Sequence, residues 1–373
     1  MQTHTIIPTP RPGILFMPDI SGFTRFVNET AISHSQHIIA ELLEVMIQAT
    51  GNAFEVSEIE GDAILFFRLE EQPVLHELEE LVHHIYISFH QHLKYYQRDL
   101  ICHCGACSSV SNLSLKFILH YGQLSTLSVG DRIKLAGRDV IAVHRFLKNS
   151  VPLKEYILIS SELAQSSKAL PEELRGYIPL KENFEGLGEI SYFYKPLDGW
   201  LKSIPEPPPL EHFKLPVIRR MEKTRIKATA EEVLYALTEP SQRLCWMTGL
   251  KRITLRKHKI NRVKTVHECI LGHQQVEVRI EDYAQDGGKI KLIETGTIQV
   301  PSLKITTLYQ IEPVGDQEAI VGIGVHLTPQ HGFLSKLLLP LAKYFMELNS
   351  IKNLNNLKKL LEDKQTKAEV ACH

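Results

Sequence analysis

The pattern of hydrophobic and polar positions changes character about halfway along the chain. In the first half, apolar residues recur at helical spacing in two long segments, 35–51 and 74–97, which predicts two helices. Shorter apolar runs predict strands at 13–18, 53–60, 63–68, 115–121, 156–160 and 190–194, with one further helix at 139–149. Strands and helices that interleave in this way predict an α/β or α+β sandwich.

The second half predicts an antiparallel sheet closed by a helix. A strand at 217–226 precedes a capping-box signal, in which Thr229 and Glu232 open a short helix. In residues 274–282, QQVEVRIED, apolar and charged side chains alternate, as in a strand with one face in water. Two more strands and a long helix are predicted at 303–311, 319–327 and 333–361. This order predicts a curved sheet with a cavity beneath the last helix.

A proline-rich segment, IPEPPPLEHFKL, separates the two halves. Proline lacks a backbone N–H and favours an extended spacer over a helix or a central strand. We therefore predict a first domain at 1–203, a linker at 204–215, a second domain at 216–362 and a flexible tail at 363–373. Both domains have an ordinary size for independently folding units.

Composition and charge exclude several classes of binding partner and several cellular locations for this protein. The 42 basic and 43 acidic residues leave a net charge of −1, which argues against a nucleic-acid partner because such proteins carry a basic excess. The apolar segment 333–346 is too short to span a bilayer and contains lysines and a proline. The first residues lack the pattern of a secretory signal, and six cysteines do not make a disulfide framework. We therefore predict a cytoplasmic protein without a membrane span.

Two aspartates mark the most informative segments of the first half. Asp19 lies in FMPDISGFT and Asp62 lies in SEIEGDAILF, each at a strand end or in a turn between strands. Two converging carboxylates can hold Mg²⁺ or Mn²⁺, and metals so placed can promote phosphoryl transfer. On spacing alone, an alternative stays open in which Asp19 caps a loop and Asp62 supplies a hairpin turn.

The residues around these aspartates resemble the catalytic domain of class III adenylate and guanylate cyclases. The opening motif of that family carries Phe, Asp, Ile, Gly, Phe and Thr in this order, matched here by Phe16, Asp19, Ile20, Gly22, Phe23 and Thr24. Three later motifs match in the expected order: Gly61, Asp62 and Ala63, then the segment 115–122, and then Val140, Ala142 and Arg145 in the segment 139–147. The resemblance implies a ferredoxin-like α/β sandwich of the cyclase type over about 200 residues.

The resemblance also implies roles for individual residues. Asp19, Asp62 and the backbone carbonyl of Ile20 match the ligands of Mg²⁺ or Mn²⁺ in the family. Arg145 matches an arginine that stabilises charge on the reacting phosphate, an electrostatic contribution that is often large in catalysis. Because the family forms its active site between two subunits, the resemblance implies a homodimer that binds a nucleoside triphosphate.

Two positions depart from the cyclase pattern. Ile141 stands where the family has an asparagine that orients the ribose, and an isoleucine side chain can neither donate nor accept a hydrogen bond. Glu58 stands at the purine-reading position and is of the guanylate cyclase type, but Lys134 replaces its usual companion. The resemblance therefore implies a nucleotide site that is degenerate.

Three cysteines form the densest group of metal-ligand residues in the chain. Cys102, Cys104 and Cys107 have C-x-C-x-x-C spacing, which allows them to share one Zn²⁺ with a fourth ligand. Candidates for that ligand are His90, His92, His103 and His120. Two alternatives stay open, an iron–sulfur cluster and a cysteine-rich loop without a metal.

The second half resembles the START-like, polyketide-cyclase-type helix-grip superfamily. The resemblance is carried by the segment 226–233, IKATAEEV, by Trp246 after the second short helix, and by the order of elements. It implies a cavity for a small apolar ligand, which Trp246, His267, Tyr309 and His326 can line. The alternative for each of these residues is an ordinary place in the sheet.

Together the two resemblances suggest three functions. The leading hypothesis is a sensor or signalling protein in which a divergent cyclase-homology domain is coupled to a START-like ligand-binding domain, a combination that resembles an uncharacterised bacterial family of unknown function. The second is an active, metal-dependent nucleotidyl cyclase, a phosphorus–oxygen lyase that uses Asp19, Asp62 and Arg145. The third is a zinc-stabilised interaction scaffold without enzymatic activity.

Overall fold

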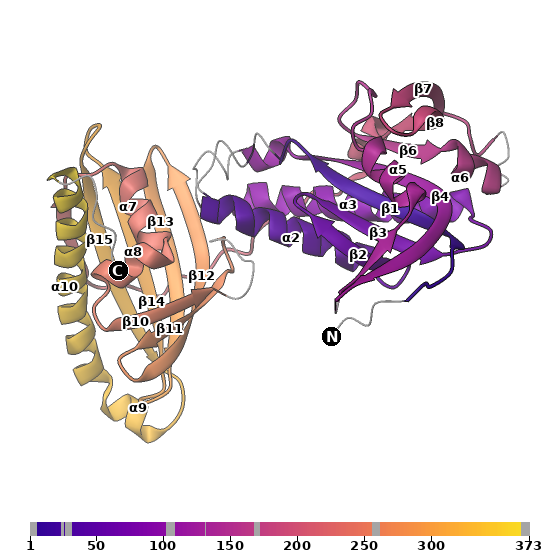
Figure 1. Ribbon diagram of the computed structural model, residues 1–373. Coiled ribbons are helices and arrows are strands. Elements are labelled where there is room, and N and C mark those ends of the chain that lie inside the picture. Colours follow the sequence, from indigo (N-terminus) through magenta and orange to yellow (C-terminus); the bar gives the residue numbers. More distant parts are fainter. Residues whose placement is uncertain are drawn as a thin grey trace. The chain divides into compact units, whose positions relative to one another are not determined.

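The computed structural model describes residues 6–23, 26, 32–101, 109–130, 132–167, 172–255 and 262–366 of the chain (Figure 1). The chain forms two compact units. The first unit comprises residues 1–98 and 108–207, and the second comprises residues 99–107 and 208–373. The second unit therefore takes in a short segment that lies between two parts of the first unit in sequence.

The first unit is a mixed sheet with helices on its faces. Its strands are β1 (Arg11–Ser21), β2 (Glu55–Glu60), β3 (Ala63–Leu69), β4 (Ser114–Val129), β5 (Arg132–Ala136), β6 (Tyr156–Ser160), β7 (Ile178–Phe184) and β8 (Gly188–Pro196). Its helices are α2 (Ile32–Thr50), α3 (Leu75–Asp99), α5 (Arg138–Phe146) and α6 (Ser161–Ser166), with short 3₁₀ turns at Val110–Asn112 and Asp198–Ser203. The strands follow the order β2-β3-β1-β4-β6-β8-β7, with β5 paired to β4.

Strand β1 lies at the centre of this sheet and is buried on both faces. Leu15 and Met17 face a core that also contains Val140 and Phe146 of α5. On the other face, the ring of Phe16 stacks against Phe66 and Phe117 with centroids 5.7 and 6.1 Å apart. A strand that is covered on both faces needs apolar side chains at successive positions, which explains the uninterrupted apolar run at residues 13–18.

The second unit is a seven-stranded antiparallel sheet with a long helix packed against it. Its strands are β9 (Met221–Ile226), β10 (Leu250–Leu255), β11 (Val266–Leu271), β12 (Gln274–Asp286), β13 (Lys289–Ile298), β14 (Leu303–Pro313) and β15 (Ala319–Pro329), in the order β10-β11-β12-β13-β14-β15-β9. Its helices are α7 (Ala230–Thr238), α8 (Pro240–Trp246), α9 (Phe333–Leu337) and α10 (Leu339–Thr366). The predicted fold class, an α+β sandwich followed by a helix-grip domain, is confirmed.

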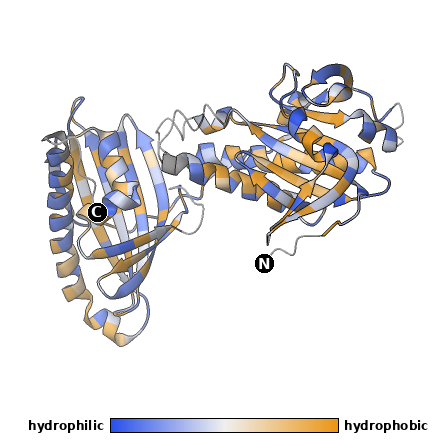
Figure 2. Cartoon of the chain, in the orientation of Figure 1, coloured by the Kyte–Doolittle hydropathy of each residue, from blue (hydrophilic) through white to orange (hydrophobic). Residues whose placement is uncertain are grey.

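Local signals in the second unit act as predicted. The hydroxyl of Thr229 accepts from the N–H of Glu232, and the Glu232 carboxylate accepts from the N–H of Thr229, which completes the capping box of α7. Buried and accessible residues alternate along much of β12, and Figure 2 shows the matching alternation of hydropathy. These features orient one face of the sheet toward α7, α8 and α10.

The end of the chain differs from the single helix predicted at 333–361. Two helices, α9 and α10, meet at Leu338. Near the end of α10, Leu354, Leu357 and Leu361 pack into the core of the second unit. Near its start the apolar side chains are exposed instead, as for Leu341 at 53 % and Tyr344 at 59 %. No helix among the described residues is long and apolar enough to cross a membrane.

Candidate functional site

Asp19 and Asp62 lie at the same end of neighbouring strands. Asp19 is near the end of β1, and Asp62 follows Gly61 in the turn between β2 and β3. Gly61 has a φ of +62°, in the left-handed region that glycine adopts without steric cost. Pairing of β1 with β3 sets Asp19 opposite Ala63, and the N–H of Ile20 donates to the carbonyl of Asp62 over 3.1 Å. The fold thus brings together the two carboxylates that the sequence singles out.

A lysine of the chain already pairs with one of these carboxylates. Lys116 is the cross-strand partner of Asp19 on β4, and its Nζ lies 3.0 Å from Oδ2 of Asp19. The same ammonium donates to the carbonyl of Leu147 over 3.1 Å. Partial burial, and next the charge of Asp19, raise the pKa of Asp62 to about 6, while Lys116 opposes this rise. The two aspartates therefore share a site with one built-in positive charge.

This donor set fits a divalent cation poorly. Within the described parts of the chain, no third carboxylate, imidazole or thiolate joins Asp19 and Asp62 to complete a metal-binding group. The carbonyl of Ile20 is the one further ligand that the resemblance supplies. A cation with a charge of +2 would have to displace the ammonium of Lys116 or bind beside it against Coulomb repulsion.

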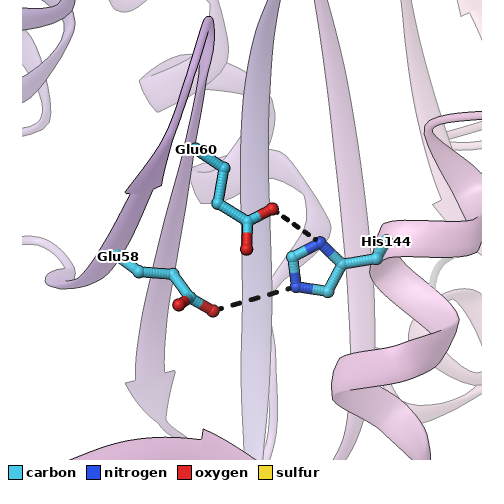
Figure 3. A group of neighbouring side chains, drawn as sticks. All are labelled: Glu58, Glu60 and His144. Atoms are coloured by element: carbon cyan, nitrogen blue, oxygen red, sulfur yellow. Dashed lines mark ion pairs between the residues drawn. The ribbon is translucent and has the colours of Figure 1, made fainter.

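The purine-reading position is also occupied by an ion pair. Nζ of Lys134 on β5 donates to Oε2 of Glu58 on β2 over 3.0 Å. His144 of α5 lies beside both glutamates of β2, with Nδ1 3.3 Å from Oε2 of Glu60 and Nε2 4.0 Å from Oε1 of Glu58 (Figure 3). Glu58 therefore faces Lys134 and His144, and its carboxylate is less available for the edge of a base.

Glu58, Glu60 and His144 form a group that the sequence analysis missed. One ligand atom from each lies within 4.8 Å of the other two, a spacing that could hold a metal ion. Glu58 and Glu60 are two positions apart on a strand and so share a face, a signal that the sequence contains. The position of His144 opposite them depends on how α5 packs, which no local pattern reveals.

The two remaining cyclase positions lie on α5. Ile141 is 54 % exposed, and its apolar side chain presents no hydrogen-bonding group. Arg145, one helical turn later, is 39 % exposed and lies 3.7 Å from Oε2 of Glu185. Arg145 thus remains accessible to an anion, whereas the ribose position offers no polar contact.

The histidines proposed as a fourth zinc ligand have partners of their own. His90 lies 2.7 Å from a carboxylate oxygen of Glu155, and His92 lies 3.1 Å from one of Glu41. His120 lies 3.2 Å from Oδ1 of Asp139. Cys102, His103, Cys104 and Cys107 lie outside the described residues, so the zinc site stays a prediction.

A buried polar cluster lies in the core of the second unit. It consists of five side chains, none more than 4 % exposed: Arg243 of α8, His267 and Cys269 of β11, Glu294 of β13 and Tyr309 of β14. Nη2 of Arg243 lies 2.5 Å from Oε2 of Glu294. His267 and Tyr309 are among the residues that the sequence singles out, whereas the ion pair joins residues 51 positions apart and has no local sequence signal.

The cluster contains one charged pair, Arg243 and Glu294, and three neutral side chains. Burial, and next the charge of Arg243, lower the pKa of His267 to about 3, so the imidazole is neutral at pH 7. Burial raises the pKa of the Cys269 thiol to about 11 and also raises the pKa of Tyr309. Burial alone would lower the pKa of Arg243, but the charge of Glu294 outweighs it and keeps the guanidinium protonated.

Several polar atoms of the cluster have no hydrogen-bond partner among the residues that the structure describes. They are Nε of Arg243, Oε1 of Glu294, and both ring nitrogens of His267. Each unpartnered buried polar group costs roughly 1–3 kcal/mol, so four cost about 4–12 kcal/mol, comparable to the ~5–15 kcal/mol net stability of a whole protein. A cluster of this kind calls for partners from outside the chain, either water or a ligand.

The other two predicted cavity residues lie in different surroundings. Trp246 is buried in the core, where its indole N–H donates to the carbonyl of Ala236 over 2.7 Å. His326 of β15 has Nδ1 3.1 Å from the carbonyl oxygen of Val217. It lines a groove of about 320 Å³ that also includes Met346 and Ser350 of α10. The structure therefore separates His326 from His267 and Tyr309.

Two family patterns match the chain. Residues 39–156 match a family described as a protein of unknown function, DUF2652. Residues 219–362 match the family described as polyketide cyclase/dehydrase and lipid transport. The predicted combination of a domain of unknown function with a polyketide-cyclase-type domain is thus confirmed.

Individual proteins are similar as well. An uncharacterized protein of Mycobacterium tuberculosis, Rv2561/Rv2562, is 33 % identical over 166 residues, which is 42 % of this chain and 72 % of that protein. Among solved structures, the guanylate cyclase domain of RhGC from Catenaria anguillulae in complex with GTP is 15 % identical, with a TM-score of 0.37 over 49 % of this chain and 95 % of that one. The adenylyl cyclase CyaB from P. aeruginosa is 16 % identical, with a TM-score of 0.37 over 51 % and 95 %.

Proposed function

Because the chain belongs to the family of the uncharacterized mycobacterial protein Rv2561/Rv2562, whose name carries no activity, we propose a function from the two units themselves. The chain is a sensor protein. Its START-like unit binds a small, mainly apolar ligand, and its cyclase-like unit keeps a nucleotide site that does not cyclise nucleotides.

One observation carries the proposal for the first unit: the chain's own lysines pair with the acidic residues on which a cyclase would depend. Lys116 lies 3.0 Å from Asp19, and Lys134 lies 3.0 Å from Glu58. At an effective dielectric constant of 20, two unit charges 4 Å apart interact by about 4 kcal/mol, so an ammonium repels a divalent ion by about 8 kcal/mol. Even a fifth of this repulsion lowers metal affinity more than tenfold.

The ribose position supports the same proposal. Ile141 offers no hydrogen bond, whereas Arg145 remains accessible for a phosphate. A nucleotide held by phosphate contacts alone has neither its sugar nor its base oriented for in-line attack. Orientation of the reacting groups accounts for a large part of catalysis, so a loosely held nucleotide would react slowly.

The architecture and the buried polar groups of the second unit support the proposal that it binds a ligand. A curved antiparallel sheet packs against α10, and polar atoms in its core have no hydrogen-bond partner in the described part of the chain. Ligand sites of this type are mainly apolar with a few polar groups that fix the orientation of the ligand. The description of the family that matches this unit includes lipid transport, which agrees with an apolar ligand.

A specific observation favours a second candidate, an active nucleotidyl cyclase that works as a homodimer. Asp19 and Asp62 lie on adjacent strands, and Arg145 is accessible, as that function requires. The two candidates differ in what happens at Lys116. An active enzyme needs this ammonium to give way to a metal ion, whereas a degenerate site keeps it paired with Asp19.

Manganese binding by the full chain tests the proposal. Free Mn²⁺ is followed by electron paramagnetic resonance during titration of the wild type, Lys116→Gln and Asp62→Ala, with and without GTP. We expect Lys116→Gln to bind one Mn²⁺ at least tenfold more tightly than the wild type, and Asp62→Ala to match the weak wild-type binding. Tight binding by the wild type that Asp62→Ala abolishes and Lys116→Gln leaves unchanged would favour the active cyclase.

A further inference from the structure

We infer that Glu58, Glu60 and His144 bind one Zn²⁺ ion, which links strand β2 to helix α5. Strand β2 supplies both carboxylates and α5 supplies the imidazole, whose ring lies between them (Figure 3). The site uses neither Asp19 nor Asp62. It therefore does not depend on whether the first unit binds a nucleotide.

The distances between these side chains suit a tetrahedral zinc ion. Nδ1 of His144 lies 3.3 Å from Oε2 of Glu60. Zn²⁺ holds nitrogen and oxygen ligands at about 2.0–2.2 Å, so two ligands of a tetrahedral ion lie about 3.4 Å apart. Oε1 of Glu58 lies 4.0 Å from the other ring nitrogen, Nε2. Two ligands thus already have the required separation, and Glu58 reaches the ion by rotation about its own side-chain bonds.

The ligand types favour Zn²⁺ over Mg²⁺ or Mn²⁺. An imidazole nitrogen suits Zn²⁺, whereas Mg²⁺ and Mn²⁺ prefer sites built from oxygen. Three protein ligands leave a fourth position for water, an arrangement that zinc adopts in proteins. The three side chains are between 21 % and 48 % exposed, so water can reach this position. The pair Asp19 and Asp62, by contrast, offers oxygen ligands alone.

The local charge attracts a cation. The two carboxylates carry two negative charges, and Lys134 beside Glu58 returns one positive charge. His144 lies in the last turn of α5, where the helix dipole places partial negative charge and favours cations. Arg145, the other basic residue of this turn, lies 3.7 Å from Glu185 instead. A divalent ion at His144 therefore enters a region of net negative potential.

Lys134 opposes a bound ion less than Lys116 opposes an ion at Asp19. The side chain of Lys134 is 64 % exposed, whereas that of Lys116 is 18 % exposed. Water screens the charge of an exposed lysine, and such a side chain can turn away. Lys134 also donates to Oε2 of Glu58 and leaves Oε1 to face His144. Hydrogen bonds of this kind commonly orient the carboxylates that ligate a metal.

An ion pair without a metal is the competing explanation of this group. A protonated imidazole of His144 would pair with both glutamates. The chain offers a matched control in α3, where Nε2 of His76 lies 3.1 Å from Oε1 of Glu80 on an exposed surface. That pair is not part of a group of three metal-ligand side chains among the described residues. Replacing His76 therefore removes an exposed histidine–glutamate pair without removing a zinc ligand.

Zinc binding by the full chain tests the inference. Zn²⁺ is titrated at pH 7.5 in competition with a chromophoric chelator, and circular dichroism verifies the fold of each protein. We expect the wild type to bind one more equivalent of Zn²⁺ than His144→Leu, and Glu60→Gln to weaken this ion by about tenfold or more. His76→Leu should match the wild type. A zinc site at the cysteines would contribute equally to all four proteins, so the difference between them is what counts.

Two further variants locate the ion. Lys134→Gln removes the neighbouring ammonium and should raise the zinc affinity by about two- to fivefold, the equivalent of one exposed ion pair. Asp62→Ala should leave zinc binding unchanged. Equal zinc binding by the wild type and His144→Leu would overturn the inference, and so would loss of the ion in Asp62→Ala or His76→Leu. None of these results bears on cyclase activity, so the proposed function is tested separately.

Discussion

Replacing His267 by leucine should make the second unit less sensitive to acid. The pKa of His267 is lowered to about 3 in the folded chain, whereas an unfolded histidine titrates near 6.5. Below pH 6.5 the unfolded state therefore binds a proton that the folded state refuses, and stability is lost as the pH falls. At 1.36 kcal/mol per pH unit, the imidazole alone removes about 2 kcal/mol of stability between pH 7.5 and pH 5.0. His267→Leu should abolish this part of the acid sensitivity.

The same variant should also be more stable at neutral pH. Leucine has a similar volume and leaves no unpartnered ring nitrogen, so we expect a gain of roughly 1–3 kcal/mol at pH 7.5 in the absence of ligand.

Urea unfolding of the full chain measures both effects. The chain has two tryptophans, and a Trp200→Phe background leaves Trp246, in the core of the second unit, as the one fluorescent reporter. Free energies of unfolding are compared at pH 7.5 and pH 5.0 for this background with and without His267→Leu. If both proteins lose the same free energy between the two pH values, His267 is not a buried neutral imidazole and the reasoning is refuted.

Two further predictions concern the first unit, and each is measured by urea unfolding followed by circular dichroism. Asp62→Asn should stabilise it at pH 7.5 by about 1–2 kcal/mol after allowance for solvent screening, and by little at pH 4. Asp62 ionises near pH 3.8 in the unfolded chain but only near pH 6 in the folded one, so its cost to stability builds up between these two pH values and is complete above about pH 6; equal gains at pH 7.5 and pH 4 would contradict this. Gly122→Ala should destabilise it by roughly 1–3 kcal/mol, since an added Cβ would overlap the Asp139 carboxylate that pairs with His120. An unchanged unfolding midpoint would show that Asp139 moves aside freely.

Local patterns predicted most of the secondary structure. The strand at 156–160 and the capping box of α7 agree with the structure, because the signals for both lie within a few consecutive residues. The helix predicted at 333–361 divides at Leu338, and part of its apolar surface is exposed. Hydropathy predicts that such side chains are buried, but only tertiary packing decides which face of a helix meets the core.

The pairs of residues on which the proposed function rests could not be predicted from the sequence. Lys116 meets Asp19 only because β1 and β4 pair in one particular register. The contact between Arg243 and Glu294 likewise depends on how α8 packs onto β13. Motif comparison finds the positions that match a family, whereas an added lysine beside them becomes visible only in three dimensions.

A cyclase assay tests the central claim most directly, that the first unit does not perform cyclase chemistry. The full chain is incubated with Mn²⁺ and either ATP or GTP, and cyclic nucleotides are quantified by mass spectrometry. Asp62→Ala serves as the control for a contaminating activity. The account predicts no cyclic product above that control with either nucleotide. A cyclic nucleotide made by the wild type and lost in Asp62→Ala would contradict it.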